Sequence, residues 1–143
     1  MKKLLFAVIV LSSLAGCASV PMGSPQQDTG LKQFHAPADK AGLYVYRNET
    51  FGSAIRLQVK LDNAPLGDTA AHTYLYKEVA PGKHALTSEG DDQGLVIDAK
   101  PGKNLYVWQE VKMGFASARS KLHLVDEQTG QQGVRECKLA ETK

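Results

Sequence analysis

Short runs in which apolar and polar residues alternate, separated by turn residues, fill most of the sequence beyond residue 40. In the clearest run, residues 55–61, branched apolar side chains occupy every second position, and Arg56, Gln58 and Lys60 occupy the positions between them. A period of two places these sets on opposite faces of a strand, whereas a helix needs a period near 3.6. The pattern predicts a strand with one buried and one solvated face.

Six other runs also have strand character, and glycine and proline punctuate them. Pro81-Gly82 and Pro101-Gly102 each predict a type II turn, because proline sets φ at the first central position and glycine supplies the positive φ of the second. Asp62-Asn63 predicts another turn, closely followed by the turn residues 65–67. The seven predicted strands are residues 43–47, 55–61, 73–79, 84–88, 95–98, 104–112 and 121–125.

The predicted fold is therefore all-β, a single β-sandwich of about seven strands spanning residues 41–143. A short helix is predicted near the end, over residues 126–135, because Asp126 can cap it and places negative charge at its positive end. Residues 17–40 are rich in Pro, Gly, Ser, Gln and Ala, which predicts a flexible tether before the domain.

The first sixteen residues have the layout of a secretory signal peptide, with Lys2 and Lys3, an apolar run over 4–11, and then small residues. The apolar run is too short to span a bilayer, which takes about 20 residues as a helix. It is followed by Leu14-Ala15-Gly16-Cys17, which resembles the lipobox of bacterial lipoproteins.

That resemblance implies that Leu14, Ala15 and Gly16 are recognised by a signal peptidase, which cuts before Cys17. It also implies that Cys17 carries a diacylglyceryl group and an acylated amine, so that residues 1–16 form the signal peptide. An ordinary signal peptide with a chance cysteine, or an apolar segment of a cytoplasmic protein, are the alternatives. The residue after Cys17 is Ala18 and not aspartate, and by the sorting rule of such lipoproteins this indicates the periplasmic face of the outer membrane.

The charge balance and the cysteine content bear on which kinds of partner the protein can bind. The 17 basic and 15 acidic residues become 15 of each once Lys2 and Lys3 leave with the signal, so no basic excess favours nucleic acid. With Cys17 committed to lipid, Cys137 is an unpaired thiol in an oxidising compartment. It is expected to be a small buried hydrophobe, with an intermolecular disulfide as the alternative.

Aromatic residues recur at every second position in three predicted strands, so that each pair shares one face of its strand. In two of these strands the opposite face carries the aliphatic pairs Leu43 with Val45 and Leu105 with Val107. An outer aromatic platform that stacks on sugars or on a partner is one hypothesis; burial in the core or beneath the C-terminal helix is the alternative. The pairs are Tyr44 with Tyr46, Tyr74 with Tyr76, and Tyr106 with Trp108.

The familiar catalytic and cofactor motifs do not occur in the sequence. His35, His72, His84 and His123 have no metal-ligand spacing, and neither a nucleophile-elbow motif nor a nucleotide-binding glycine loop is present. The acidic cluster at residues 89–92 lacks the EF-hand pattern and is expected to be a solvated loop. We expect no cofactor, no metal and no catalytic residues.

Residues 43–49, 59–86, 97–111 and 122–130 together resemble a family of proteobacterial lipoproteins with an uncharacterised domain related to PEGA-like β-sandwiches. The resemblance covers about residues 42–139, and its most diagnostic parts are the strand ending at Asp62, the nearby Gly67, and residues 79–84. Asn63-Ala64 stands where such domains commonly have Gly-Lys. The resemblance implies an immunoglobulin-like sandwich and an envelope location, and it implies no reaction.

Three functions remain open at this point. The first is a non-enzymatic binding or structural module held at the membrane, with an envelope protein as a candidate partner. The second is a glycan- or peptidoglycan-binding module that uses the aromatic face. The third is a periplasmic enzyme acting on cell-wall material, which would need polar groups converging in a pocket. The oligomeric state does not follow from the sequence.

Overall fold

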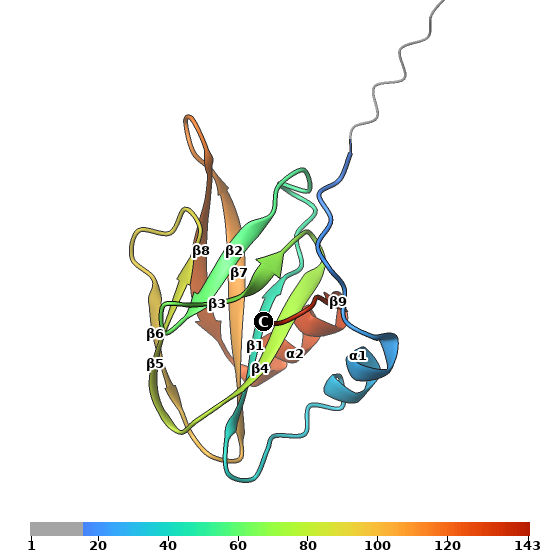
Figure 1. Cartoon of the computed structure of the whole chain (residues 1–143), viewed down its shortest axis with the longest axis vertical. Coiled ribbons are helices and arrows are strands. Elements are labelled where there is room, and N and C mark those ends of the chain that lie inside the picture. The colour runs from blue at the N-terminus through green and yellow to red at the C-terminus, as the bar shows by residue number, and fades with distance from the viewer. Residues whose placement is uncertain (1–15) are drawn as a thin grey trace, which may run out of the picture.

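The computed structural model describes residues 16–143, so that Leu14 and Ala15 of the lipobox-like motif lie outside the described residues. The described chain forms two β-sheets and two short helices (Figure 1), which confirms the predicted sandwich. In chain order the elements are α1 (Pro25–Leu31), β1 (Ala41–Arg47), β2 (Leu57–Leu61), β3 (Ala64–Thr69), β4 (Thr73–Val79), β5 (Gly82–Ser88), β6 (Leu95–Ala99), β7 (Lys103–Met113), β8 (Ala118–Val125), α2 (Glu127–Arg135) and β9 (Lys138–Leu139).

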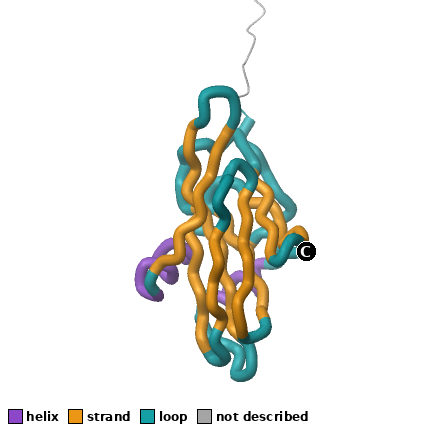
Figure 2. The backbone as a smooth tube through the Cα atoms, turned by 90° about the vertical axis from the view of Figure 1, so that its left-hand side faces the viewer, coloured by secondary structure: helices purple, strands orange, loops and turns teal. Residues whose placement is uncertain are grey.

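The larger sheet has the order β8-β7-β1-β4-β9, with β1 at its centre. Every residue of β1 is buried, because one face of this sheet packs on the second sheet and the other lies under the helices. β1 pairs antiparallel with β4 but parallel with β7, and Ala41 is the partner of Lys103. Figure 2 shows the strands running lengthwise, with loops at both ends.

The smaller sheet has the order β3-β2-β5-β6. Asp62 and Asn63 both have positive φ and join β2 to β3 as a two-residue hairpin turn, as the sequence predicts. β3 itself is absent from the prediction, which treats Pro65-Leu66-Gly67 as turn residues. The strand tolerates Pro65 because it lies at the sheet edge, and the register shifts by one residue where it pairs with Val59 and Lys60.

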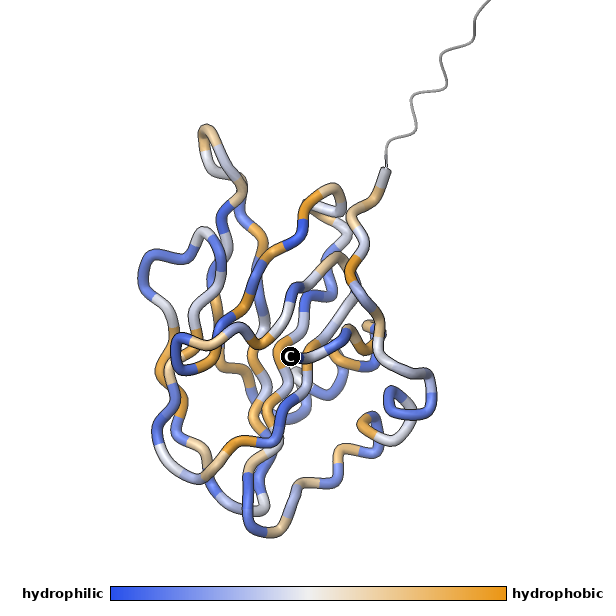
Figure 3. The backbone as a smooth tube through the Cα atoms, viewed as in Figure 1, coloured by the Kyte–Doolittle hydropathy of each residue, from blue (hydrophilic) through white to orange (hydrophobic). Residues whose placement is uncertain are grey.

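Between the sheets lies an aliphatic core. Leu43, Val45 and Val107 contribute to it as predicted, and each is fully buried. Leu105 packs against the same core but is only partly buried. Figure 3 shows hydrophobic residues along the strands that enclose this core, alternating with hydrophilic ones.

The helices form a third layer on the far face of the larger sheet. α2 begins after Asp126, whose side chain accepts from the backbone N–H of Thr129, as the predicted cap requires. α1 begins after Ser24, which caps it in the same way, and Pro25 occupies its first turn. The prediction of a flexible tether over residues 17–40 is therefore wrong: Val20 is buried, α1 is a helix, and Phe34 packs against the sheet.

The two ends of the described chain hold each other. Met22 bridges Ala140, the N–H of Gly23 donates to the carbonyl of Leu139, and the N–H of Glu141 donates to that of Pro21. β9 in turn pairs with β4 and completes the sheet. Over residues 16–143, no helix has the length and apolar character needed to cross a membrane.

Candidate functional site

The three predicted aromatic pairs meet on the helix-covered face of the larger sheet. Their strands are neighbours, and the strand register aligns the pairs in two rows across β4, β1 and β7. Within the first row, the rings of Tyr44 and Tyr106 stack with centroids 5.1 Å apart. The two rows are Tyr76-Tyr44-Tyr106 and Tyr74-Tyr46-Trp108.

The hypothesis that these aromatics form an outer platform is wrong, because the helices and the segment after α1 cover them. The hydroxyl of Tyr44 donates to the carbonyl of Leu31 at 2.8 Å, so that its polar tip is already used inside the protein. Tyr76 and Trp108 are partly exposed, at the margins of the layer. Four of the six are at most 3% exposed, namely Tyr44, Tyr46, Tyr74 and Tyr106. The alternative of burial beneath the C-terminal helix is the observed one.

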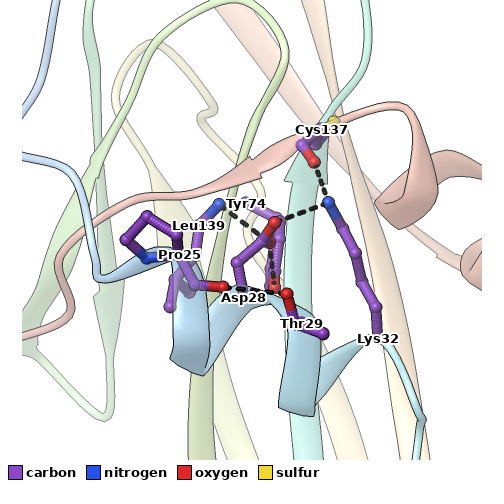
Figure 4. A network of polar contacts seen from close by, with 7 residues as sticks. All are labelled: Pro25, Asp28, Thr29, Lys32, Tyr74, Cys137 and Leu139. Carbon is purple, nitrogen blue, oxygen red and sulfur yellow. Dashed lines mark hydrogen bonds and ion pairs between the residues drawn. The ribbon is translucent and has the colours of Figure 1, made fainter.

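Asp28 joins α1 to this layer through both carboxylate oxygens (Figure 4). Oδ1 accepts from the hydroxyl of Tyr74 at 2.7 Å and from the N–H of Leu139 at 3.2 Å. Oδ2 accepts from Nζ of Lys32 at 2.9 Å, and Lys32 also donates to the carbonyl of Cys137. Burial, together with the bond to Asp28, raises the pKa of Tyr74 well above its usual range. The network ties the N-terminal helix to β4 and β9.

A groove of about 560 Å³ opens beside this network, between α1 and the last residues of the chain. Leu31, Tyr76 and Leu139 supply apolar walls, and Glu141 supplies the single carboxylate of its lining. A groove of this kind can hold an apolar or aromatic group. The complete lining is Gly23, Gln27, Gly30, Leu31, Tyr76 and residues 139–142.

Cys137 is a free thiol and only 2% exposed, which agrees with the buried-hydrophobe prediction. Its Sγ lies 3.5 Å from the carbonyl oxygen of Arg47, to which the thiol donates. Burial raises the pKa of Cys137 to about 12, so that the reactive thiolate is disfavoured at neutral pH. The arrangement gives no support to an intermolecular disulfide at this position.

The histidines lie apart from one another and have different partners. His84 contacts Asp62 through Nδ1 at 2.6 Å and the carbonyl of Ala80 through Nε2 at 2.7 Å. His123 contacts Glu110 at 2.7 Å, and His72 contacts Thr50. His35 is exposed. Within residues 16–143, no three His, Cys, Asp or Glu side chains gather as metal ligands would.

The described chain begins at one end of the sandwich with Gly16 and Cys17, both exposed. The next residue is already fixed, because the N–H of Ala18 donates to the carbonyl of Ser53 at 2.8 Å in the loop between β1 and β2. Exposed Cys17 is thus attached to the folded domain without an intervening spacer (Figure 1).

Arg47 holds the loop between β1 and β2 together. The sequence does not indicate this role, because Arg47 is only the polar last residue of the predicted strand 43–47. Its side chain is fully buried, and its guanidinium donates to the carbonyls of Gly52 and Ile55, at 2.5 and 3.0 Å. Burial lowers the pKa of Arg47 without discharging it. Asp28 was likewise missed, because it falls in the segment interpreted as a tether.

The chain is similar to proteins whose role is not defined. The model of the family described as "Protein of unknown function (DUF2846)" matches residues 37–121, which is more than half of the chain. An uncharacterized protein of Haemophilus influenzae is 30% identical over 130 residues, covering 89% of this chain and 77% of that protein. No solved structure matched the chain. The matched span begins just before β1, takes in β1 to β7 and ends within β8, so that α2 and β9 lie outside it. The chain therefore belongs to the DUF2846 family of proteins of unknown function.

Proposed function

We propose that the mature protein is a bacterial lipoprotein, anchored by acyl chains on Cys17, whose β-sandwich is a non-enzymatic binding or structural module in the envelope. It faces the periplasm from the outer membrane, because Ala18 follows the anchor and no aspartate retention signal does. The domain is of the PEGA-like kind that its sequence motifs resemble.

The observation that carries this proposal is the position of Cys17. The motif Leu14-Ala15-Gly16-Cys17 follows a charged and then apolar leader, and the cysteine is exposed next to Ala18, which bonds to the β1–β2 loop. Lipidation there needs no rearrangement of the domain. One acyl chain holds a protein at a bilayer only reversibly, whereas two or three hold it durably.

A module fits the rest of the surface better than an enzyme does. The groove beside Tyr76 has apolar walls and one carboxylate, which suits capture of an apolar segment of a partner. The buried thiol of Cys137 and the separated histidines do not converge on that groove.

The test is intact mass measurement of the protein from its native host, together with membrane fractionation of Cys17→Ser. We expect the native protein to begin at Cys17 and to carry a diacylglyceryl group and an amide-linked acyl chain. Cys17→Ser should persist as an unprocessed precursor without lipid. Cys137→Ser is the matched control and should be processed as the native protein is. An unmodified Cys17, or normal processing of Cys17→Ser, would refute the anchor.

A further inference from the structure

Three large apolar side chains project into solvent at the end of the sandwich where the described chain begins. Phe51 is 54% exposed, Met113 is 72% exposed, and Phe115 is completely exposed. Phe51 lies in the loop between β1 and β2, and the other two lie at the tip of the β7–β8 hairpin. Figure 1 places both segments at the upper end, where the chain starts, and Figure 2 agrees.

Buried contacts hold the loop that carries Phe51 in place. The buried guanidinium of Arg47 donates to the carbonyls of Gly52, within its turn, and Ile55, after it, and the N–H of Ser53 donates to the carbonyl of Thr50 at 3.0 Å. Ala18 is bonded to the same loop, so that Cys17 lies directly beside it. Figure 3 shows hydrophobic positions in this loop next to hydrophilic ones. A rigid base with an exposed apolar tip is arranged to enter an apolar medium without further ordering.

The β7–β8 tip combines apolar and basic residues in a fixed order. Met113 pairs with Ala118 at the last rung, and residues 114–117 close the turn with Phe115 outermost. The next rung pairs Lys112 with Arg119, both exposed. Lys112 is paired with Glu110 at 3.6 Å, so Arg119 is the cation of this rung that remains open to an anionic headgroup. An aromatic tip beside such a cation matches the acyl boundary and the headgroups of a lipid leaflet.

We infer that this end of the domain, formed by the β1–β2 loop and the β7–β8 tip, is a lipid-binding surface that contacts the leaflet into which Cys17 is anchored. The inference rests on the proposed anchor and adds to it a defined orientation. The strands stand upright on the membrane, and the groove beside Tyr76 lies on the flank of the domain. Ala18, the residue after Cys17, is bonded to the β1–β2 loop. The acyl chains on Cys17 therefore hold these loops at the membrane surface.

The test uses the mature, lipidated protein in vesicles of phosphatidylethanolamine and phosphatidylglycerol. A polarity-sensitive fluorophore is attached to Ala116→Cys at the tip, to Ala54→Cys in the β1–β2 loop, or to Lys100→Cys in the turn at the opposite end. Cys137 is buried and does not compete for the label. We expect blue-shifted emission and quenching by brominated lipid at residues 116 and 54, and neither at residue 100. Insertion of about 5–10 Å, to the headgroup and acyl boundary, would produce this pattern.

A matched variant separates apolar contact from mere proximity. Adding Phe115→Ser to Ala116→Cys should greatly reduce the quenching while leaving lipidation unchanged. If all three labels report water in protein whose mass shows acylated Cys17, the lipid-binding surface is refuted and the anchor stands. If Cys17 carries no lipid, the label is placed on protein that also has Cys17→Ser, so that residue 116 is its exposed thiol. If added vesicles still shift that label, the anchor is refuted and the lipid-binding surface stands.

Discussion

Gly130 and Gly133 lie where α2 crosses the aromatic layer, and both positions demand the smallest side chain. A Cβ at Gly133 would overlap the ring of Tyr46, and one at Gly130 would overlap the ring of Tyr106. Glycine within a helix normally weakens it by about 1 kcal/mol relative to alanine. Here it lets the helix approach the sheet closely enough to cover the tyrosines.

The first prediction therefore concerns whether a glycine-to-alanine change raises or lowers the free energy of unfolding. Gly133→Ala should lower the free energy of unfolding by about 1–3 kcal/mol, because the ring of Tyr46 or the helix must move. Gly30→Ala in α1 is the control: its Cβ meets nothing within 4 Å, so helix propensity should raise stability by up to about 1 kcal/mol. Urea denaturation measures both. Equal effects of the two changes would contradict close packing of α2.

The second prediction concerns the buried thiol. Because burial raises the pKa of Cys137 to about 12, the folded protein should react with a thiol reagent at pH 8 far more slowly than the same protein in denaturant. Cys17→Ser, which leaves Cys137 as the only thiol, is the protein to use. Rapid reaction of the native state, or a dimer on a non-reducing gel, would contradict this placement.

At the scale of single residues, the sequence predicts which side chains share a face but not what covers that face. Period two correctly groups Tyr44 with Tyr46 and Leu43 with Val45 on opposite faces of β1. Both faces of a central strand can be buried, and nothing in the alternation says whether a helix or water lies over the aromatic one. The answer depends on α2 and on α1, which are distant in the chain.

At the scale of elements, α1 shows how tertiary contacts decide a marginal segment. A seven-residue helix containing Gly30 is too short to be stable alone. Ser24-Pro25 is a recognisable start signal, but the composition of the segment outweighed it in the prediction. The bonds of Asp28 to Tyr74 and Leu139 are what hold the helix, and they cannot be read from the sequence.

The third prediction tests that role. Asp28→Ala should lower the free energy of unfolding by about 1–3 kcal/mol, because it leaves the hydroxyl of Tyr74 and the N–H of Leu139 without their partner. Limited proteolysis should then cut within residues 20–40 before the rest of the domain. Thr29→Ala is the neighbouring control, since Thr29 bonds only to the carbonyl of Pro25 inside the helix. Identical cleavage of both variants would show that Asp28 does not hold α1 on the sheet.

The contact between Asp62 and His84 joins the β2–β3 turn to the start of β5, and both residues fall in the motifs that carry the family resemblance. The bonds to Asp62 and to the carbonyl of Ala80 raise the pKa of His84 above 6.5. The resulting stabilisation is present below that value and is lost as the pH rises through the raised pKa. The bond to His84 lowers the pKa of Asp62 below 3.8, so its contribution is lost as the pH falls through the lowered pKa.

The fourth prediction follows from these signs. The difference in unfolding free energy between the native protein and Asp62→Asn should be greatest between the two ordinary values, 3.8 and 6.5. It should shrink at higher pH, where His84 becomes neutral. Thermal unfolding across this pH range measures it. A difference independent of pH would mean that His84 is uncharged in the contact.

For the molecule as a whole, the sandwich and its seven main strands follow from the sequence, because alternation and turn chemistry act locally. β3 does not follow, since Pro65 and Gly67 are ordinary turn residues whose edge position becomes evident only once β2 is paired. β9 is two residues long and has no local signal. The exposed tip at Phe115 also lay outside the prediction, because alternation indicates burial along a strand and gives no information about a hairpin turn.

The fifth prediction concerns the pairing of the two ends. Deleting residues 138–143 removes β9 and buried Leu139, and should lower the free energy of unfolding by about 3 kcal/mol or more. Hydrogen exchange should accelerate over residues 18–34 as well, because their partners are gone. Deleting only residues 141–143 keeps β9 and the Met22–Ala140 bridge, and should have a smaller effect. Unchanged exchange in the N-terminal segment would show that its structure does not depend on the C-terminus.

The interlocking of Met22 and Gly23 with residues 139–140 also dictates when the protein can mature. A chain that emerges from its amino end, whether from a ribosome or a translocation pore, cannot close the larger sheet or seat its first helix until its final residues are free. Partial chains therefore lack the partners of Met22 and Gly23, and the fold is completed only after residues 139–140 have emerged.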